Sequence, residues 1–384
     1  MATVVAGLHA GMTLLTGMTL LNGMTLGPSS VLAVSDIAHA PFWVQFTQIV
    51  GSVLGVFLII GIGAFCRSQK WLSREADFSL AKITANVLMP ALFLDRILND
   101  ETLDALSTAW VPPLFGFGFT TGGLLLAWLI ARAAGPWVGL KTDAQQRAFA
   151  ICAGIANYGY IPLPLSQIFY PSAEVELILH NVGVDLALWS VGIAIISGGT
   201  RSAAGAAGGE QNAPMRSSFP RLGLFGKILP ALTSAPLIAV VIALSIRSLN
   251  WDAMIPPSLM KSIHLLAGAS IPMGLLLSGA IIIDFLRAAQ WTGATPVILL
   301  SIGFRQLLMP VIMLGVASVW ATQTDMKHVL ILQAAMSSAV FPIVLTRLYH
   351  GDTATALRVV LSTSLAGLVL IPIWISLGAW WLGV

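Results

Sequence analysis

The sequence predicts an all-α polytopic membrane protein with ten transmembrane helices. Apolar residues make up 57% of the 384-residue chain and charged residues only 9%, whereas a soluble domain carries about 25% charged residues. The apolar residues form long continuous stretches, and most positive charges lie in alternate connections between them. This composition excludes an ordinary soluble enzyme and a disordered chain. A net charge of only +3 with no basic face argues against binding to nucleic acid.

Each of ten stretches is long enough to span a bilayer, which takes roughly 20 apolar residues. We place them at 43–66, 75–98, 109–133, 146–170, 174–198, 222–248, 260–285, 294–320, 326–349 and 353–382. Strands of a membrane β-barrel would instead alternate apolar and polar residues. Only helices satisfy their own backbone in lipid over such lengths. The two cysteines, Cys66 and Cys152, lie far apart in apolar surroundings, so we expect neither a disulfide framework nor a metal site.

The charges of the connections predict the orientation. One side holds Arg67, Lys70, Arg74, Arg132, Lys141, Arg147, Arg201, Arg216, Arg221, Lys227, Arg287, Arg347 and Arg358. The other side holds Arg96, Arg247, Lys261 and Lys327, together with Asp100, Glu101 and Asp104. The positive-inside rule places the first set in the cytoplasm. We therefore expect a multi-pass protein of the cell membrane with both termini outside.

The chain divides into four predicted parts. Residues 1–42 form a low-complexity extension in which Gly-Met-Thr-Leu occurs three times. A cleaved signal peptide is the alternative, but no Lys or Arg precedes its candidate cleavage site. Residues 43–198 hold five spans, 199–221 form a Gly-, Ala- and Ser-rich cytoplasmic linker, and 222–384 hold the other five. An odd number of spans in each half forces the two halves into inverted orientations.

The fourth and ninth spans carry helix-breaking residues at equivalent places. The fourth contains Asn157, Gly159 and Pro162, and the ninth contains the Ser337–Ser338 pair followed by Pro342. Proline removes a helical N–H and clashes with the carbonyl four residues earlier. Opened backbone at membrane depth is tolerated only where it is buried in protein or lines a cavity.

Broken spans at matching positions of inverted halves indicate a transporter binding site near the membrane midplane. The N-termini of the half-helices would direct positive dipole ends and free N–H groups at that site, which favours an anion. We expect Asn157, Gly159, Pro162, Ser337, Ser338 and Pro342 to line it. The alternative is that the prolines only kink two continuous helices.

Several stretches resemble the auxin efflux carrier family, which includes plant auxin exporters and bacterial carboxylate permeases. They are Asn86–Phe93, Asn157–Pro164, Ser270–Ala280, Arg305–Pro310 and Leu361–Trp374. Each is a weak pattern alone, but their order and spacing are specific. The resemblance covers about residues 43–382, and the short central loop places the chain nearer the bacterial organic anion permeases.

The resemblance implies two inverted five-helix repeats that cross at helices 4 and 9. It implies an elevator-like movement of spans 3–5 and 8–10 against a scaffold of spans 1–2 and 6–7, often in a homodimer. It also implies small organic anions, such as mono- or dicarboxylates, as substrates. No cofactor is expected.

Ionisable residues inside spans are candidates for function, because a charge in the bilayer is unfavourable. Arg305 in the eighth span could attract the anion, or could pair with Asp185 or with a backbone carbonyl. Asp185 in the fifth span is a candidate for coupling to H⁺, while Na⁺ is the other candidate ion. His180 and His264 are expected near outer span ends, and Asp95 and Asp284 are expected to be solvated.

The predicted function is therefore a secondary carrier of small organic anions. No G-x-x-x-x-G-K-[ST], H-E-x-x-H or G-x-S-x-G motif occurs, which argues against ATP-driven transport and against enzymatic activity. A channel and an intramembrane enzyme are the alternatives. Neither a pore nor a filter signature is visible in the sequence.

Overall fold

The computed structural model describes residues 42–384 apart from 101–108, 199–233, 290, 292 and 322. The described residues form helices and their connections, without a β-strand. The all-α prediction is therefore confirmed for this part of the chain. The low-complexity extension, apart from residue 42, and the predicted linker 199–221 lie outside it. Residues 45–384 form one compact unit, and the contacts below lie within that unit.

Seven helical runs are long and apolar enough to cross a bilayer, counted over the described residues. They contain α3 (Phe42–Ser68), α4 (Arg74–Ile83) with α5 (Met89–Asn99), α6 (Val111–Ala133), α10 (Glu174–Ala187), α14 (Pro257–Ala288), α15 (Thr295–Ile302) with α16 (Met309–Trp320), and α19 (Thr353–Leu382). Three of these runs contain a π-helical turn: η2 (Thr84–Leu88), η4 (Leu188–Gly192) and η6 (Gly303–Leu308). Their length and composition agree with a multi-pass membrane protein.

The other three predicted spans correspond to shorter helices. The sixth appears as α13 (Ala235–Ser248), which follows the undescribed residues 199–233. The fourth consists of α8 (Asp143–Gly154) and α9 (Pro162–Phe169), and the ninth of α17 (Thr324–Ala335) and α18 (Phe341–Leu348). Each piece is too short to cross a bilayer alone.

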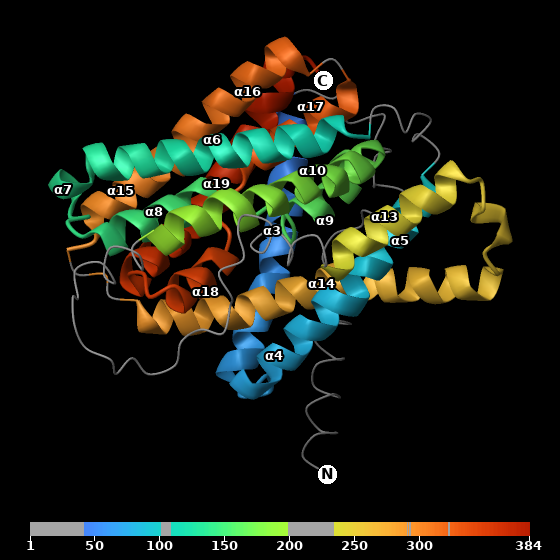
Figure 1. Cartoon of the computed structure of the whole chain (residues 1–384), viewed down its shortest axis with the longest axis horizontal. Coiled ribbons are helices and arrows are strands. Elements are labelled where there is room, and N and C mark those ends of the chain that lie inside the picture. The colour runs from blue at the N-terminus through green and yellow to red at the C-terminus, as the bar shows by residue number, and fades with distance from the viewer. Residues whose placement is uncertain (1–41, 101–108, 199–233, 290, 292, 322) are drawn as a thin grey trace, which may run out of the picture. The chain divides into compact units, whose positions relative to one another are not determined.

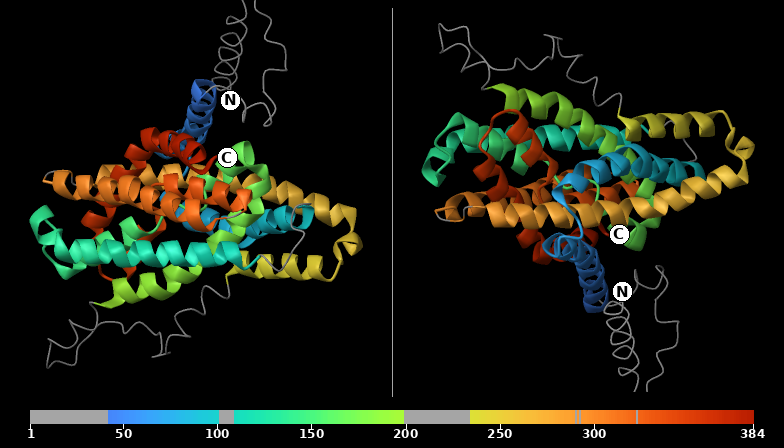
Figure 2. Two further views of the ribbon diagram at one scale, coloured as in Figure 1. Left: turned by 90° about the horizontal axis from the view of Figure 1, so that it is seen from above. Right: turned by 90° about the horizontal axis from the view of Figure 1, so that it is seen from below.

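The helices of residues 45–384 pack in two groups. In one group α5 lies against α13 and α14, and in the other α6 lies against α8 and α10 while α19 lies against α15 and α17 (Figures 1 and 2). The two groups touch mainly where α5 meets α10 and where α14 meets α19. Packing is therefore denser within each group than between them.

Helices α6 and α10 pack most extensively against each other, because glycines allow their backbones to approach closely. A Cβ atom on Gly183 would lie 1.9 Å from the Pro113 carbonyl oxygen. A Cβ atom on Gly116 would lie 2.1 Å from the His180 carbonyl oxygen. Real Cβ atoms do not come that close, so any larger residue would force the two helices apart.

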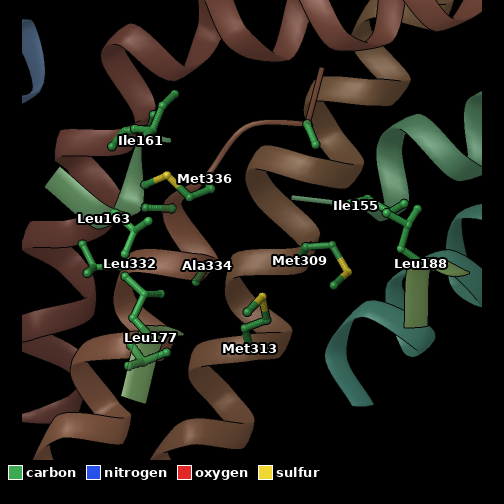
Figure 3. Packing of buried hydrophobic residues seen from close by; sticks show 14 of the residues in the cluster. Ile155, Ile161, Leu163, Leu177, Leu188, Met309, Met313, Leu332, Ala334 and Met336 are labelled. Atoms are coloured by element: carbon green, nitrogen blue, oxygen red, sulfur yellow. The ribbon is translucent and has the colours of Figure 1, made fainter. Parts of the chain in front are cut away.

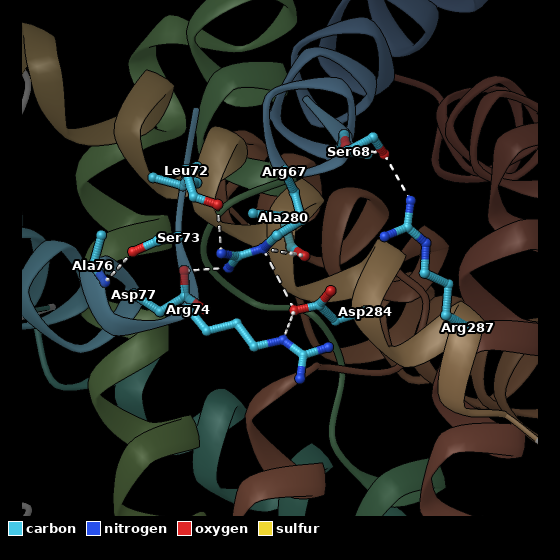
Figure 4. Close-up of polar contacts among 11 residues, drawn as sticks. Arg67, Ser68, Leu72, Ser73, Arg74, Ala76, Asp77, Ala280, Asp284 and Arg287 are labelled. Atoms are coloured by element: carbon cyan, nitrogen blue, oxygen red, sulfur yellow. Dashed lines mark hydrogen bonds and ion pairs between the residues drawn. The ribbon is translucent and has the colours of Figure 1, made fainter. Parts of the chain in front are cut away.

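A polar cluster joins one end of α14 to α3 and α4 (Figure 4). Arg67, which is 6% exposed, donates to the Leu72 carbonyl at 2.7 Å and pairs with Asp77. Asp284 lies 3.4 Å from Arg67 and 3.0 Å from Arg74. The expectation that Asp284 is simply solvated is therefore wrong. Two arginines hold this carboxylate at the helix ends.

Candidate functional site: a crossing of two broken helices

Two helix breaks, at residues 155–161 and 336–340, face each other inside the second group. We call the place where they meet the crossing. Helix α8 ends at Gly154 and the chain turns extended at Ile155, before α9 begins at Pro162. Helix α17 ends at Ala335 and the chain is extended at Met336, before α18 begins at Phe341. The breaks therefore lie at the positions that the helix-breaking residues indicate.

The two breaks are hydrogen-bonded to each other. The Asn157 N–H donates to the Ser337 carbonyl at 2.7 Å, and the Ala339 N–H donates to the Ile155 carbonyl at 3.0 Å. Ala156 and Ser338 form the antiparallel bridge between these bonds. Breaking a helix leaves backbone N–H and C=O groups without their helical partners. Here each broken segment supplies hydrogen-bond partners for such groups of the other. Buried backbone groups inside a bilayer need such partners.

Apolar residues surround this crossing (Figure 3). Ile155, Leu163, Leu332 and Met336 are completely buried. They belong to a hydrophobic core cluster that also includes Met309 of α16. The backbone at Ile155 and Met336, where the two breaks begin, is thus enclosed by protein.

The prolines limit what the half-helices offer to a ligand. Pro162 and Pro164 have no N–H, and the Leu163 N–H between them already donates to the Gly159 carbonyl at 3.1 Å. In α18, Pro342 has no N–H and the Ile343 N–H donates to the Val340 carbonyl at 3.1 Å. At these positions of both helix starts, the expected N–H groups are therefore missing or already bonded. The helix dipole remains.

Arg305 lies in the π-helical turn η6, beside the second break. Its side chain is 2% exposed. Its Nε donates to the Met336 carbonyl at 2.9 Å and its Nη2 to the Gln333 carbonyl at 3.1 Å, at the C-terminus of α17. Of the three roles considered, pairing with a backbone carbonyl is the one observed, and the pairing with Asp185 is wrong. No carboxylate in the described residues lies within ion-pair distance of Arg305.

The two serines of the second break are enclosed, while the first break is partly open. Ser337 and Ser338 are 0% exposed, and their hydroxyl groups have no hydrogen-bond partner among the described residues. The Ser338 N–H donates to Thr363 Oγ1 of α19 at 3.3 Å. Asn157 and Gly159 are partly exposed. The site residues expected from the sequence thus come together from both halves of the chain.

The structure adds Tyr158, and the hydrogen bonds around it, to the residues expected at this site. Tyr158 donates its hydroxyl to Asp185 Oδ1 at 2.6 Å. Gln333 Nε2 lies 3.2 Å from the Tyr158 carbonyl and 3.2 Å from Asn181 Oδ1. Asp185 therefore joins the crossing through a tyrosine. The signal in the sequence was the position of Tyr158 directly after Asn157 in the break.

Comparisons with known proteins show the family of this chain. A model of the membrane transport protein family matches residues 48–375. The chain belongs to this family, the auxin efflux carrier family. It is also 23% identical over 328 residues to an uncharacterized transporter of Methanothermobacter thermautotrophicus, covering 84% of this chain and 96% of that protein. The family assignment predicted from the sequence is confirmed.

In this membrane transport protein, one residue of the crossing reaches the other helix group. The Tyr160 ring lies against Gly274 of α14, where a Cβ atom would come within 2.1 Å of Tyr160 Cε1. Gly268, in the same helix, has open space at its Cβ position. Tyr160 therefore links the first break to α14 by close packing.

His180 faces the same region from α10. It is 2% exposed, so its ring is buried between helices. Neither ring nitrogen has a hydrogen-bond partner among the described residues. Together with Arg305 and Gln333, His180 lines a cavity of about 10 Å³, the volume of roughly one water molecule. This cavity is therefore too small for an organic molecule in this conformation.

A second polar recess of about 420 Å³ lies between α5 and α14. Asp95 is 2% exposed, and both its oxygens lie 3.2 Å from His264 Nδ1, so the expected solvated carboxylate is not observed. The neighbouring Arg96 pairs with Glu174 of α10 at 3.2 Å. These contacts tie the two helix groups together at this end. The described residues hold no cluster of three or more His, Cys, Asp or Glu side chains suited to a metal.

Proposed function

We propose that this protein is a secondary carrier of small organic anions, such as mono- or dicarboxylates, and that its substrate site is the crossing of the two broken helices. The proposal rests mainly on the surroundings of the Arg305 side chain. This side chain is a buried guanidinium with no carboxylate within ion-pair distance in the described residues.

A buried cation without a counter-ion is unfavourable in a low-dielectric interior. The carbonyls at the C-terminus of α17 compensate part of this charge, both by hydrogen bonding and by the helix dipole. A guanidinium has five N–H groups, and these two bonds use two of them. A substrate carboxylate reaching the crossing would supply the missing negative charge and accept the remaining donors.

Asn157, Ser337 and Ser338 are the neutral groups proposed to complete the site, with Gly159, Pro162 and Pro342 shaping the backbone around them. The serine hydroxyls are buried without partners in the described residues. Buried polar groups normally find a hydrogen-bond partner. A bound anion would provide an acceptor for both of them.

The proposed architecture is ten spans in two inverted five-helix repeats. Seven long helical runs, two broken pairs and α13 supply ten elements in the predicted order. The division into two packing groups supports movement of spans 3–5 and 8–10 against the others. Because the cavity of about 10 Å³ at the crossing cannot hold a carboxylate, substrate must enter through a different conformation.

Coupling to H⁺ or Na⁺ is part of the proposal, with Asp185 as the proton-coupling candidate. A negative-inside potential expels an anion by about 2.3 kcal/mol per charge per 100 mV. Uptake therefore needs a coupled cation or an exchanged anion. Replacing Asp185 by Asn should abolish proton-driven uptake and leave exchange of substrate for substrate intact. A homodimer in the cell membrane with both termini outside completes the proposal.

The test uses the full chain in proteoliposomes on a solid-supported membrane. Currents are recorded on adding malonate, malate, lactate or indole acetate, with and without Na⁺ or a pH gradient. We expect saturable current for one class, lost in Arg305→Gln and kept in Lys82→Gln, whose side chain is exposed on α4. Counterflow of labelled substrate separates a carrier from a channel. No current and no counterflow for any anion, from folded protein, would overturn the proposal.

A further inference from the structure

A large groove lies away from the crossing, along α6 and α10. Its volume is about 1110 Å³. Apolar side chains make up most of its wall, including Phe117 and Leu125 from α6 and Val191 and Ile195 from the run that continues α10. Its charged residues, Arg132, Asp143 and Arg147, all belong to the end of α6 and the start of α8.

The charged end of the groove is positive overall. Asp143 lies between the two arginines, with Oδ1 2.8 Å from Arg132 Nη2 and Oδ2 3.1 Å from Arg147 Nη1. One carboxylate therefore faces two guanidinium groups. The Arg132 guanidinium also lies 5.0 Å from the centre of the Trp128 ring, which forms part of the groove wall.

The Arg147 guanidinium has buried N–H donors that are not used in hydrogen bonds with the described residues. It is 7% exposed, and its Nε and Nη1 make no hydrogen bond with any described residue, although Nη1 is within ion-pair distance of Asp143. A buried, partly unpartnered guanidinium at the end of an apolar groove matches a ligand with an anionic head and a hydrocarbon tail.

We propose that this groove binds a phospholipid with an anionic headgroup, its phosphate against Arg132 and Arg147 and an acyl chain along α6 and α10. Basic pockets between transmembrane helices on the cytoplasmic side bind acidic lipid headgroups, and the positive-inside prediction puts these arginines on that side. This site is separate from the proposed substrate site, and its occupancy does not depend on transport.

The segment that follows Gly198 is a poorer match. Residues 199–221 contain Arg201, Arg216 and Arg221 against the single acid Glu210, and their Gly, Ala and Ser residues offer little apolar surface. Like charges would repel this segment from Arg132 and Arg147. An acidic lipid is complementary both to the charged end and to the apolar wall.

The test measures lipid binding to the full chain. Protein is delipidated in detergent and titrated with phosphatidylglycerol or phosphatidylcholine of the same acyl chains, and bound lipid is counted by native mass spectrometry. We expect phosphatidylglycerol to bind with a Kd at least about tenfold lower. Arg132→Gln and Arg147→Gln should each weaken it about fivefold, because one basic residue near the membrane surface contributes about 1 kcal/mol.

Two further variants separate the groove from the general surface. Ala194→Trp places an indole in the groove from an exposed position and should reduce binding of the acyl chain without changing charge. Arg287→Gln, an exposed arginine of α14 on the same predicted side, should leave the Kd unchanged. Because Arg132 and Ala194 are exposed, these variants remain informative even if Arg147→Gln fails to fold.

Three outcomes would overturn the proposal. Equal affinity for both lipids would show that the arginines do not recognise the headgroup. Binding unchanged in Ala194→Trp would place the lipid elsewhere. Lipid binding that appears only after residues 201–215 are deleted would make the linker the occupant. Because none of these measurements involves transport, failure here leaves the proposed carrier function untouched.

Discussion

The two helix breaks of the crossing differ in how far they are buried and in which side chains bond to their backbone. The first break runs from Ile155 to Ile161, and its central residues are partly exposed. The second runs from Met336 to Val340, and its two serines are completely buried. Arg305 fixes the second break by bonding to the last carbonyls of α17. No charged side chain in the described residues bonds to the backbone of the first break.

This difference indicates that the two breaks have different roles. The second break is held within its own helix group, through Arg305 from η6 and through Thr363 of α19. The first break reaches outward, because Tyr160 packs on Gly274 in the other group. We infer that the second break forms a fixed wall of the site. The first break, through Tyr160, changes its contacts when the other helix group moves.

The largest effect is expected from Arg305→Met. This change leaves the Gln333 and Met336 carbonyls without their donor, and each hydrogen bond to a charged group contributes about 1.5–3 kcal/mol. It also removes the proposed anion-binding charge. We expect counterflow to fall at least about 100-fold, since 1.4 kcal/mol corresponds to a factor of ten. Arg305→Lys keeps the charge and should retain part of the flux. Wild-type counterflow in the methionine variant would contradict the site.

Asn157→Ala tests the open break. The bond to Ser337 uses the Asn157 backbone, so the crossing should survive loss of the side chain. We expect an unchanged melting temperature and a flux about tenfold lower, because one hydrogen bond to a charged ligand is lost. The measurement is KM and maximal rate of counterflow, compared with thermal unfolding of the same sample. A large drop in melting temperature with normal KM would make Asn157 structural.

Gly274→Ala tests the link between the two groups. The added methyl would overlap the Tyr160 ring, and overpacking destabilises by about 1–3 kcal/mol. Tyr160→Leu in the same chain should relieve the overlap and restore stability. Gly268→Ala is the matched control, since its Cβ position is open. If Gly274→Ala and Gly268→Ala behave alike, the close contact with Tyr160 has no role in transport.

The smallest structural effect is expected from Ser338→Ala. The hydroxyl is buried and has no partner in the described residues, so its removal should change the free energy of unfolding by less than about 0.5 kcal/mol or increase it. KM should rise if the hydroxyl binds substrate. Substrate-dependent thermal stabilisation of the variant and the wild-type protein measures both quantities in one titration. An unchanged KM would remove Ser338 from the binding site.

Much of the fold follows from the sequence because the bilayer imposes simple rules. Length and apolarity alone predict seven of the spans that the structure describes as long apolar helices. The breaks follow from the residues of the fourth and ninth spans, since proline removes an N–H wherever it stands. Where the expectation of solvation failed, at Asp95 and Asp284, the sequence pattern indicates depth along a helix but not which face of the helix is buried. Only neighbouring helices decide whether a face is buried.

The sequence by itself determined the class of protein, the family and the position of both helix breaks, because these depend on local composition and spacing. The tertiary structure alone decided the partners. It paired Asn157 with Ser337, placed Arg305 on the carbonyls of α17 rather than on Asp185, and brought Tyr160 onto Gly274. These contacts join residues far apart in the chain, and their geometry depends on how whole helices pack, which no local pattern encodes.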